Sequence, residues 1–415
     1  MSVFRPFRAI RPDTQFAEKV AALPYDVMTS AEAAEEVKGN PYSFLHVDKA
    51  EINFPEGIDP YDPAVYAKAA EVLQKMEADG IFRQDPVSCF YLLRQTIDGH
   101  SQTGIVGCAS IDDYINNVIK KHENTRADKE EDRVRHVTAC NANTGPIFLT
   151  YPEQIEIKKL QDSWIKAHTP VYDFTTPGSV KTEVWVIDDP TVITALTVLF
   201  GQVPALYIAD GHHRCASAVR VGKAKRDADP NFTGEEEFNF FLAVVFPSSE
   251  LFIMDYNRTA KLPEGMTKAK LMEKINEKFE IECQLQVNPF KPQEPRTFGM
   301  YVDGSWYKLT ARPGTFNESD PVDSLDVSIL QNNLICPVLG IDDPRTDKRI
   351  DFIGGIRGLK ELEQRVSSDM DIAFSMYPTS LKQLMDIADA GALMPPKSTW
   401  FEPKLLSGLF IHDLG

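Results

Sequence analysis

Residues 204–218 read PALYIADGHHRCASA, an apolar run followed at once by a polar cluster. The apolar run, 205–209, predicts a buried strand. Asp210-Gly211 is a turn dipeptide. The next apolar residues follow helical spacing and Gly222 is a typical helix end, so we expect a short helix, 214–222, packed on the strand. The polar cluster therefore lies where a strand ends and a helix begins.

Several features of this junction suit a bound anion. The first N–H groups of a helix have no partner within it, and Gly211 lets the backbone approach a ligand closely. His212, His213 and Arg214 add donors, and the Arg214 fork can bind two phosphate oxygens. A helix dipole contributes only about 0.3–1 kcal/mol, so the side chains must supply most of the affinity. We expect a phosphate or nucleotide site; the plainer alternative is a common turn with structural histidines.

The order Asp210-Gly211-His212-His213-Arg214, followed by Ala216, resembles the Asp-Gly-x-His-Arg signature of the ParB/sulfiredoxin superfamily. The resemblance implies that this loop holds nucleotide phosphates, because it does so in that superfamily, which includes free-serine kinases. It also implies a ParB/sulfiredoxin-like core.

The whole chain resembles a narrower group, the domain-of-unknown-function family 1015, which carries a SpoOJ/ParB-like label. The resemblance rests on six further stretches spread over nearly the full length. They are FRPFRA (4–9), PYDV (24–27), NPYSFLHV (40–47), HENT (122–125), TGPIF (144–148) and PPKSTW (395–400).

Composition limits the classes of function. The formal net charge is −17, whereas DNA-binding proteins usually carry a basic stripe, so we expect no nucleic-acid partner. A small phosphorylated ligand held by a few local bases is compatible with an acidic surface. No apolar run approaches the roughly 20 residues of a membrane helix, and residues 1–12 do not read as a secretory signal. Six scattered cysteines without a Cys-x-x-Cys pair predict reduced thiols and a cytoplasmic protein.

A second polar stretch covers residues 119–136. On a helix, Arg126, Lys129, Arg133 and His136 would share one face and could clamp a second phosphate or a carboxylate. The alternative is a solvated helix whose acids and bases pair with one another. The family resemblance favours a direct ligand role for this stretch, because His122, Glu123, Thr125 and Arg126 match a motif of that family.

Three acidic residues are candidates for binding a magnesium ion, Mg2+, or for acting as a base. Glu123 and Asp132 belong to the second polar stretch, and Asp210 belongs to the loop. The sequence does not show which of these carboxylates reaches the loop.

A third cationic stretch lies near the C-terminus. Lys397, Ser398, Thr399 and Lys404 stand in a proline-stiffened segment, 394–404, that suits a phosphate-facing edge. The alternative is a packed C-terminal arm anchored by aromatic side chains.

The pattern of elements predicts an α/β fold of mixed α+β type. We expect an N-terminal α/β domain, 1–151, a ParB-like domain that carries the loop, 152–330, and a C-terminal helical and loop extension, 331–415, that completes the site. Further expectations are a strand over 43–47, an exposed charged loop over 223–237, a strand over 281–287 and a loop-rich stretch over 337–358.

The predicted function is phosphoryl transfer on a small hydroxyl metabolite. The superfamily resemblance implies serine or phosphoserine, with ADP, ATP or pyrophosphate as co-substrate. Arg214, His212 and His213 would hold the transferred phosphate, while Asp210 or Glu123 would orient or deprotonate the hydroxyl. One alternative is a nucleotide-binding, ParB-like regulator without chemistry. Sulfiredoxin-like or nuclease chemistry is another, although the nearby Cys215 is expected to be buried. The sequence is compatible with a homo-oligomer.

Overall fold

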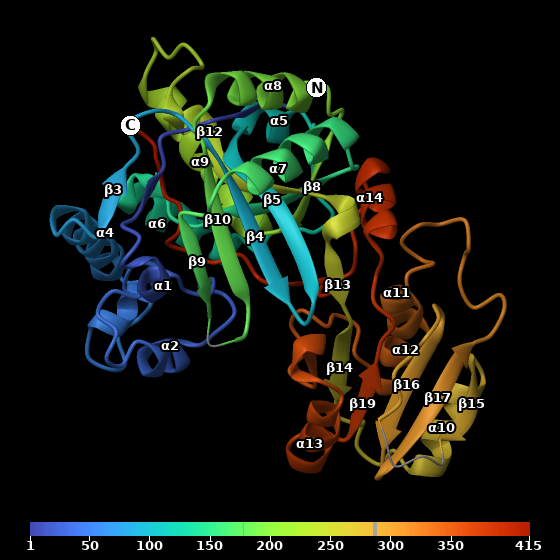
Figure 1. The fold of residues 1–415 in the computed structure, drawn as a ribbon. Helices are drawn as coiled ribbons and strands as arrows, with labels where there is room; N and C mark the ends of the chain where they lie inside the picture. The colour runs from blue at the N-terminus through green and yellow to red at the C-terminus, as the bar shows by residue number, and fades with distance from the viewer. Residues whose placement is uncertain (177, 285–288) are drawn as a thin grey trace. The chain divides into compact units, whose positions relative to one another are not determined.

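The computed structural model describes residues 1–176, 178–284 and 289–415 (Figure 1). It divides into two compact units, Met1–Leu251 with Pro403–Gly415, and Phe252–Glu402. These limits differ from the predicted boundaries at 151 and 330, because strands on both sides of residue 151 join one sheet.

The first unit is built on a mixed sheet. Its strands are β1 (Phe4–Arg5), β4 (Phe90–Ile97), β5 (His100–Ser110), β6 (Ile119–Lys120), β8 (Ile147–Tyr151), β9 (Tyr172–Thr175), β10 (Lys181–Ile187), β11 (Leu206–Asp210) and β12 (Phe240–Pro247). Within the described residues their order is β6-β11-β8-β12-β5-β4-β10-β9, with β1 paired to β5. Every residue of β12 is buried, as its continuous apolar run predicts for a central strand.

Helices and short elements complete this unit. They are α1 (Ala17–Val20), α2 (Ser30–Glu36), α3 (Leu45–Asp48), η1 (Ala50–Asn53), α4 (Pro63–Ala78), α5 (Ile111–Ile115), α6 (Ala127–Cys140), α7 (Ile155–Ala167), α8 (Pro190–Phe200), α9 (His212–Ala228), η2 (Glu237–Asn239) and η3 (Ser248–Glu250), with strands β2 (Ile10–Pro12), β3 (Phe82–Gln84), β7 (Ala142–Asn143) and β21 (His412–Asp413). Local sequence explains their starts: a Thr29–Glu32 capping box begins α2, and Asp189 caps α8 ahead of a proline.

The main core lies between one face of the large sheet and the helices α7, α8 and α9. Trp164, Phe200 and Cys215 from these helices pack in one cluster with Leu149 and Val245 from the sheet. In Figure 1, α7 and α8 lie across the strands on this face. The burial of Cys215 raises the pKa of its thiol well above the usual range, which favours packing over reactivity.

The strand–turn–helix over β11 and α9 confirms the arrangement predicted at the junction. β11 pairs in parallel with β6, so the carboxyl ends of both strands meet at one edge of the sheet. The pairing of β11 with β8 shifts register between Ile208 and Asp210, and such irregularities often re-aim a side chain at a functional site. Gly211 caps α9 with a left-handed φ of 89°, which glycine adopts without strain.

The structure corrects two predictions, one of a strand and one of the end of a helix. Residues 43–47 were expected to form a strand, but 45–48 form α3, which packs against α4 in a separate core. The helix expected over 214–222 runs from His212 to Ala228, so the expected loop 223–237 begins inside it. Gly222 does not end the helix; it lets the helix lie against the backbone of Phe238.

The second unit has its own sheet. Its elements are β13 (Phe252–Met254), β14 (Tyr256–Ala260), α10 (Lys268–Asn276), β15 (Phe279–Gln284), β16 (Thr297–Val302), β17 (Ser305–Ala311), α11 (Asp326–Leu330), the π-helical turn η4 (Gln331–Ile335), α12 (Cys336–Leu339), β18 (Ile350–Gly354), η5 (Gly355–Arg357), α13 (Lys360–Ser368), β19 (Ile372–Ser375), α14 (Leu381–Asp389) and β20 (Trp400–Glu402). The sheet order is β15-β17-β16-β19-β14-β18, and β13 pairs with β20. The stretch 337–358, expected to be loop-rich, contains β18. The expected strand 281–287 ends at 284, and 285–287 lie outside the described residues.

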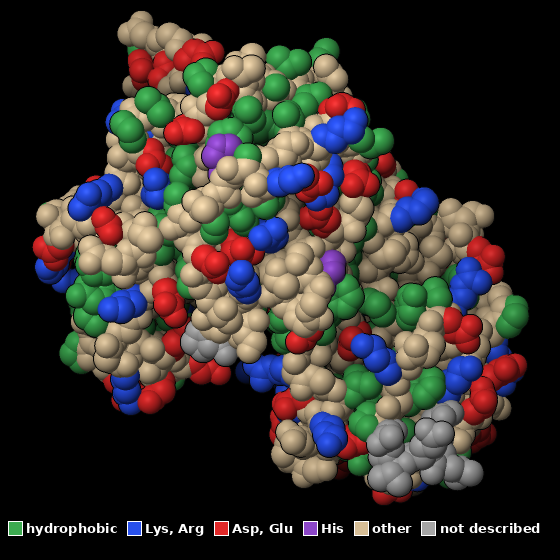
Figure 2. Space-filling model, viewed as in Figure 1, with side chains coloured by type: hydrophobic (Ala, Val, Ile, Leu, Met, Phe, Trp, Pro, Cys, Tyr) green, Lys and Arg blue, Asp and Glu red, His purple; other side chains and the backbone are tan. Residues whose placement is uncertain are grey.

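This architecture confirms the mixed α/β fold class, whereas the link to the ParB/sulfiredoxin superfamily stays a prediction. Among the described helices, none is long and apolar enough to cross a bilayer. On the face shown in Figure 2, acidic and basic side chains are interspersed rather than gathered by sign.

Candidate functional site

Arg214 lies in the first turn of α9 with its guanidinium between two glycines. A Cβ added to Gly211 would lie 3.3 Å from Nε of Arg214. One added to Gly145 would lie 3.4 Å from Nη1 of the same arginine. Nη1 donates a hydrogen bond to the carbonyl of Pro146 at 2.7 Å. Within the described chain this guanidinium makes no ion pair with a carboxylate. Arg214 thus forms no direct ion pair among the described residues, although the nearby Asp210 carboxylate interacts with its charge.

A second arginine, in α6, lines one pocket together with Arg214. Arg133 is buried, pairs with Asp132 at 2.9 Å and lies 3.9 Å from the centre of the Tyr25 ring. Burial opposes its charge, but Tyr25 and Asp132 outweigh that effect and raise the pKa of Arg133. Tyr66 donates a hydrogen bond to Asp132 and holds that carboxylate in place.

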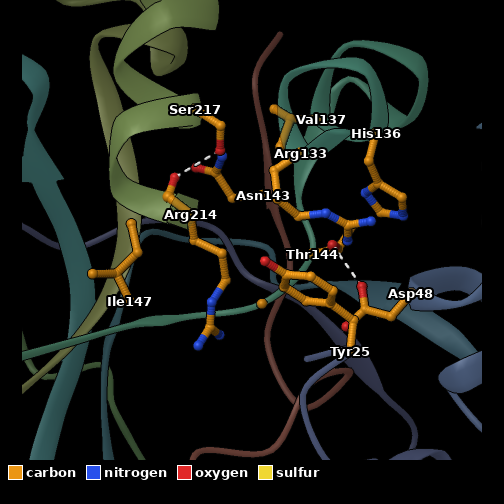
Figure 3. A pocket seen from close by; sticks show the side chains of 11 residues that line it. Tyr25, Asp48, Arg133, His136, Val137, Asn143, Thr144, Ile147, Arg214 and Ser217 are labelled. Atoms are coloured by element: carbon orange, nitrogen blue, oxygen red, sulfur yellow. Dashed lines mark hydrogen bonds between the residues drawn. The ribbon is translucent and has the colours of Figure 1, made fainter. Parts of the chain in front are cut away.

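The pocket between these arginines has about 380 Å³ of space, open solvent included. Figure 3 shows Arg214 and Arg133 extending into it from α9 and α6. Its lining residues are Tyr25, Asp48, Arg133, His136, Val137, Asn143, Thr144, Gly145, Ile147, Arg214 and Ser217. The hydroxyl of Thr144 donates to Asp48 at 3.0 Å, and the ring of His136 donates to the carbonyl of Val47 at 3.0 Å. The chemistry of these walls fits a small anion with hydroxyl or amine groups.

Asp210 is tied to the C-terminal segment of its own unit. Its carboxylate pairs with Lys404 at 2.9 Å and accepts the N–H of Gly211 at 2.8 Å. Burial disfavours ionisation, but Lys404 and Arg214 outweigh it and hold the pKa of Asp210 below its usual value. Asp210 is thus an ionised carboxylate and a weak proton acceptor at neutral pH.

The predicted cationic face of α6 divides into two parts. Arg133 and His136 line the pocket, whereas Arg126 pairs with Asp128 at 2.8 Å and Lys129 donates to the Tyr61 hydroxyl at 2.8 Å. Arg126 thus shows the salt-bridged, solvated alternative, whereas Lys129 is half-buried and bonded to a hydroxyl. A ligand role for Arg126 or Lys129 stays a prediction.

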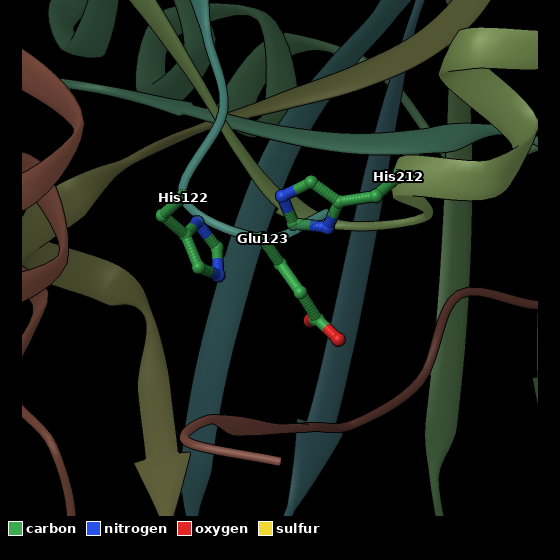
Figure 4. Close-up of side chains that lie close together, drawn as sticks. All are labelled: His122, Glu123 and His212. Atoms are coloured by element: carbon green, nitrogen blue, oxygen red, sulfur yellow. The ribbon is translucent and has the colours of Figure 1, made fainter. Parts of the chain in front are cut away.

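The two adjacent histidines of the loop differ in their surroundings. The ring of His213 accepts the backbone N–H of Arg126 at 3.0 Å, which links α9 to the start of α6. His212 points the other way and packs edge-on against His122, with 4.5 Å between ring centroids. Glu123 lies beside these two rings (Figure 4).

The predicted residues Lys397, Ser398 and Thr399 belong to the second unit. Lys397 lies outside the described helices and strands with a left-handed φ of 60°, its ammonium 5.7 Å from the centre of the Tyr256 ring. The Ser398 hydroxyl donates to the carbonyl of Pro395 at 2.6 Å. Their predicted role in holding a phosphate stays a prediction.

Sequence reasoning did not assign Tyr25 or Thr144 to the site. Both stand in stretches that carried the family resemblance, PYDV and TGPIF, so a signal was present. Neither residue type is diagnostic by itself, and only the folded chain brings them to Arg133 and Arg214.

A pH effect on stability is expected from His136. Burial, with Arg133 nearby, lowers the pKa of His136 in the folded chain, whereas in the unfolded chain it titrates near the ordinary value of about 6.5. Below that pH the unfolded state binds more protons, so acidification costs up to about 1.4 kcal/mol per pH unit. The free energy of unfolding should therefore fall below about pH 6.5 relative to a His136→Gln variant, which keeps a donor for Val47.

Urea unfolding of both proteins from pH 7.5 to 5 measures this difference. Parallel pH profiles for the two proteins would contradict it.

Comparison with known proteins gives a family and a set of remote structural neighbours. A family model described as a protein of unknown function (DUF1015) matches residues 4–328. No protein with a curated description matches the chain.

Three solved structures illustrate the remote likeness. A free serine kinase in complex with AMP is 13% identical, with 72% of this chain and 86% of that chain covered at a TM-score of 0.37. SbnI with a C-terminal truncation, from Staphylococcus aureus, is 12% identical, with coverages of 73% and 85% at a TM-score of 0.38. A conserved hypothetical protein from Pyrococcus furiosus is 13% identical, with coverages of 74% and 94% at a TM-score of 0.37.

Proposed function

This chain belongs to the DUF1015 family of proteins of unknown function, and we propose that it transfers a phosphoryl group to or from a small hydroxyl metabolite. The observation that carries the proposal is the Arg214 guanidinium, which faces a pocket without a carboxylate partner in the described chain. Arg214 is partly buried, and a bound anion would complete the coordination of its guanidinium.

The other walls of the pocket fit this chemistry. Phosphoryl transfer depends on positioning and charge neutralisation more than on covalent steps, and two arginines from separate helices can supply both. Arg214 would bind phosphate oxygens with its free N–H groups and the first amides of α9. Arg133 and Tyr25 would face the second ligand, and Asp48 with Thr144 would receive a hydroxyl or amine.

The proposed substrate pair is serine or phosphoserine with ADP, ATP or pyrophosphate. It follows from the resemblance of the Asp210–Arg214 loop to the superfamily signature. Mg2+ would then bind mainly through the nucleotide phosphates. Asp210 or Glu123 would orient the hydroxyl, and the ion pair with Lys404 makes Asp210 a weak base.

One observation favours a second candidate, a nucleotide-binding regulator without chemistry. The acid next to Arg214 is Asp210, and its ion pair makes it a weak base. A pocket that binds nucleotide but lacks a competent base would act through ligand binding alone.

Turnover measurements separate the two candidates. The protein is incubated with Mg2+ and either serine plus ATP, ADP or pyrophosphate, or phosphoserine plus ADP, and both phosphate species are followed by ³¹P NMR. We expect interconversion of serine and phosphoserine with one donor, and its loss in Glu123→Gln. Tight ADP binding without turnover for any pair would establish the regulator instead.

A further inference from the structure

Three potential metal ligands meet at one edge of the large sheet. His122 and Glu123 follow the end of β6, and His212 follows the end of β11. Because these neighbouring strands are parallel, their carboxyl ends place the following residues side by side. One ligand atom from each side chain lies within 4.8 Å of the others. Figure 4 shows the three side chains close together.

Three of the four histidine nitrogens in this cluster have no hydrogen bond among the described residues. Both ring nitrogens of His122 and Nε2 of His212 are buried without a hydrogen bond in the described chain, and the two residues are 1% and 7% exposed. The Ile208 carbonyl lies near the His122 ring but not in hydrogen-bonding geometry. A buried polar group without a hydrogen bond is costly, so several in one place point to a ligand-binding site.

The donor set points to a borderline transition metal rather than to Mg2+. Magnesium prefers oxygen ligands, whereas two imidazoles with one carboxylate suit zinc and its neighbours. Both rings are buried, and the neutral imidazole is the form that binds a cation. Tetrahedral zinc with bonds of about 2.0–2.1 Å separates its ligands by about 3.3 Å, so the side chains must close on the ion.

We propose that His122, Glu123 and His212 bind one divalent transition-metal ion of the zinc class. Three protein ligands leave a fourth position, which a water molecule or an oxygen of a hydroxyl or phosphate group would occupy. The site differs from the predicted pairing of Glu123 with Asp210, because Asp210 is already paired with Lys404. It does not depend on the proposed phosphoryl transfer, since it can be tested without nucleotide or substrate.

The test uses the full chain after removal of metals with a chelator. Co2+ is added first, because its visible absorption reports a tetrahedral nitrogen and oxygen environment, and Zn2+ is then titrated against a chromophoric chelator. We expect one ion per chain, displacement of Co2+ by Zn2+, and a rise in melting temperature with Zn2+. Mg2+ at the same concentration should not displace Co2+.

Variants locate the site. His122→Gln, His212→Gln and Glu123→Gln should each weaken Zn2+ binding by at least about tenfold, a loss that even a supporting residue of a metal site can cause. His213→Gln is the matched control, because His213 is adjacent but bonded to Arg126. Melting curves without metal show whether each variant is folded.

Two results would overturn the proposal. One is a folded, chelator-treated protein that binds neither Co2+ nor Zn2+, which would mean that water molecules bond to the buried nitrogens. The other is undiminished binding in all three folded ligand variants, which would place the ion elsewhere.

Discussion

Replacing Arg214 with alanine is expected to weaken ADP binding by about 30-fold or more while leaving the protein folded. Truncating one partner of a buried charged contact costs about 2–5 kcal/mol, and each 1.4 kcal/mol is a factor of ten in affinity. The fold should survive, because in the free protein this guanidinium makes one hydrogen bond, to the carbonyl of Pro146.

Isothermal titration with ADP and with pyrophosphate, alongside a melting curve, measures the loss. Arg214→Lys should retain intermediate affinity, since lysine keeps the charge but not the two-pronged geometry. Arg220→Ala is the matched control: it removes an arginine from the same helix, but one that is exposed and paired with Glu130 and Glu131. Equal affinity in wild type and in a folded Arg214→Ala variant would remove the loop from the binding site.

Replacing Gly222 with alanine is expected to destabilise the protein by about 1–3 kcal/mol, the usual cost of overpacking. In an exposed helix interior the same change gains about 1 kcal/mol. Here a Cβ would lie 2.4 Å from the carbonyl oxygen of Phe238 and 2.8 Å from a methyl group of Ile111. Because a backbone atom cannot swing aside as a side chain can, α9 must move away from its neighbours.

Urea unfolding of the Gly222→Ala variant tests whether the free energy of unfolding falls. A variant of the exposed neighbour, Lys223→Ala, is measured beside it. The control should change the free energy of unfolding by less than about 0.5 kcal/mol. A Gly222→Ala variant as stable as the wild type would show that the contact with Phe238 relaxes without cost. A destabilised variant would show that α9, which carries Arg214, is held in place by backbone contact.

Much of the local structure was predictable because neighbouring residues cause it. The hairpin at Asp98-Gly99, the capped start of α2 and the turn at Asp210-Gly211 all follow from turn or cap chemistry. The predictions for 43–47 and for Gly222 failed for a different reason. A short apolar run fits a helix as well as a strand, and a glycine can serve close packing as well as helix termination.

The candidate site was predictable only in part. The loop residue Arg214 was identified from its place after a strand, whereas the division of the α6 face could not be foreseen. Which of Arg126, Lys129 and Arg133 turns inward depends on the packing of α6 against α9 and α4, which no local pattern encodes.

By itself the sequence determined a mixed α/β chain with a cationic strand–turn–helix at 204–222, since strand, turn and helix signals act over a few residues. Only the tertiary structure decided which groups meet there. It joined Lys404 to Asp210 across 194 positions, set His122 against His212, and brought Arg133 to the pocket of Arg214. Such encounters depend on how strands pair and helices pack, and those arrangements come from the burial of surfaces far apart along the chain.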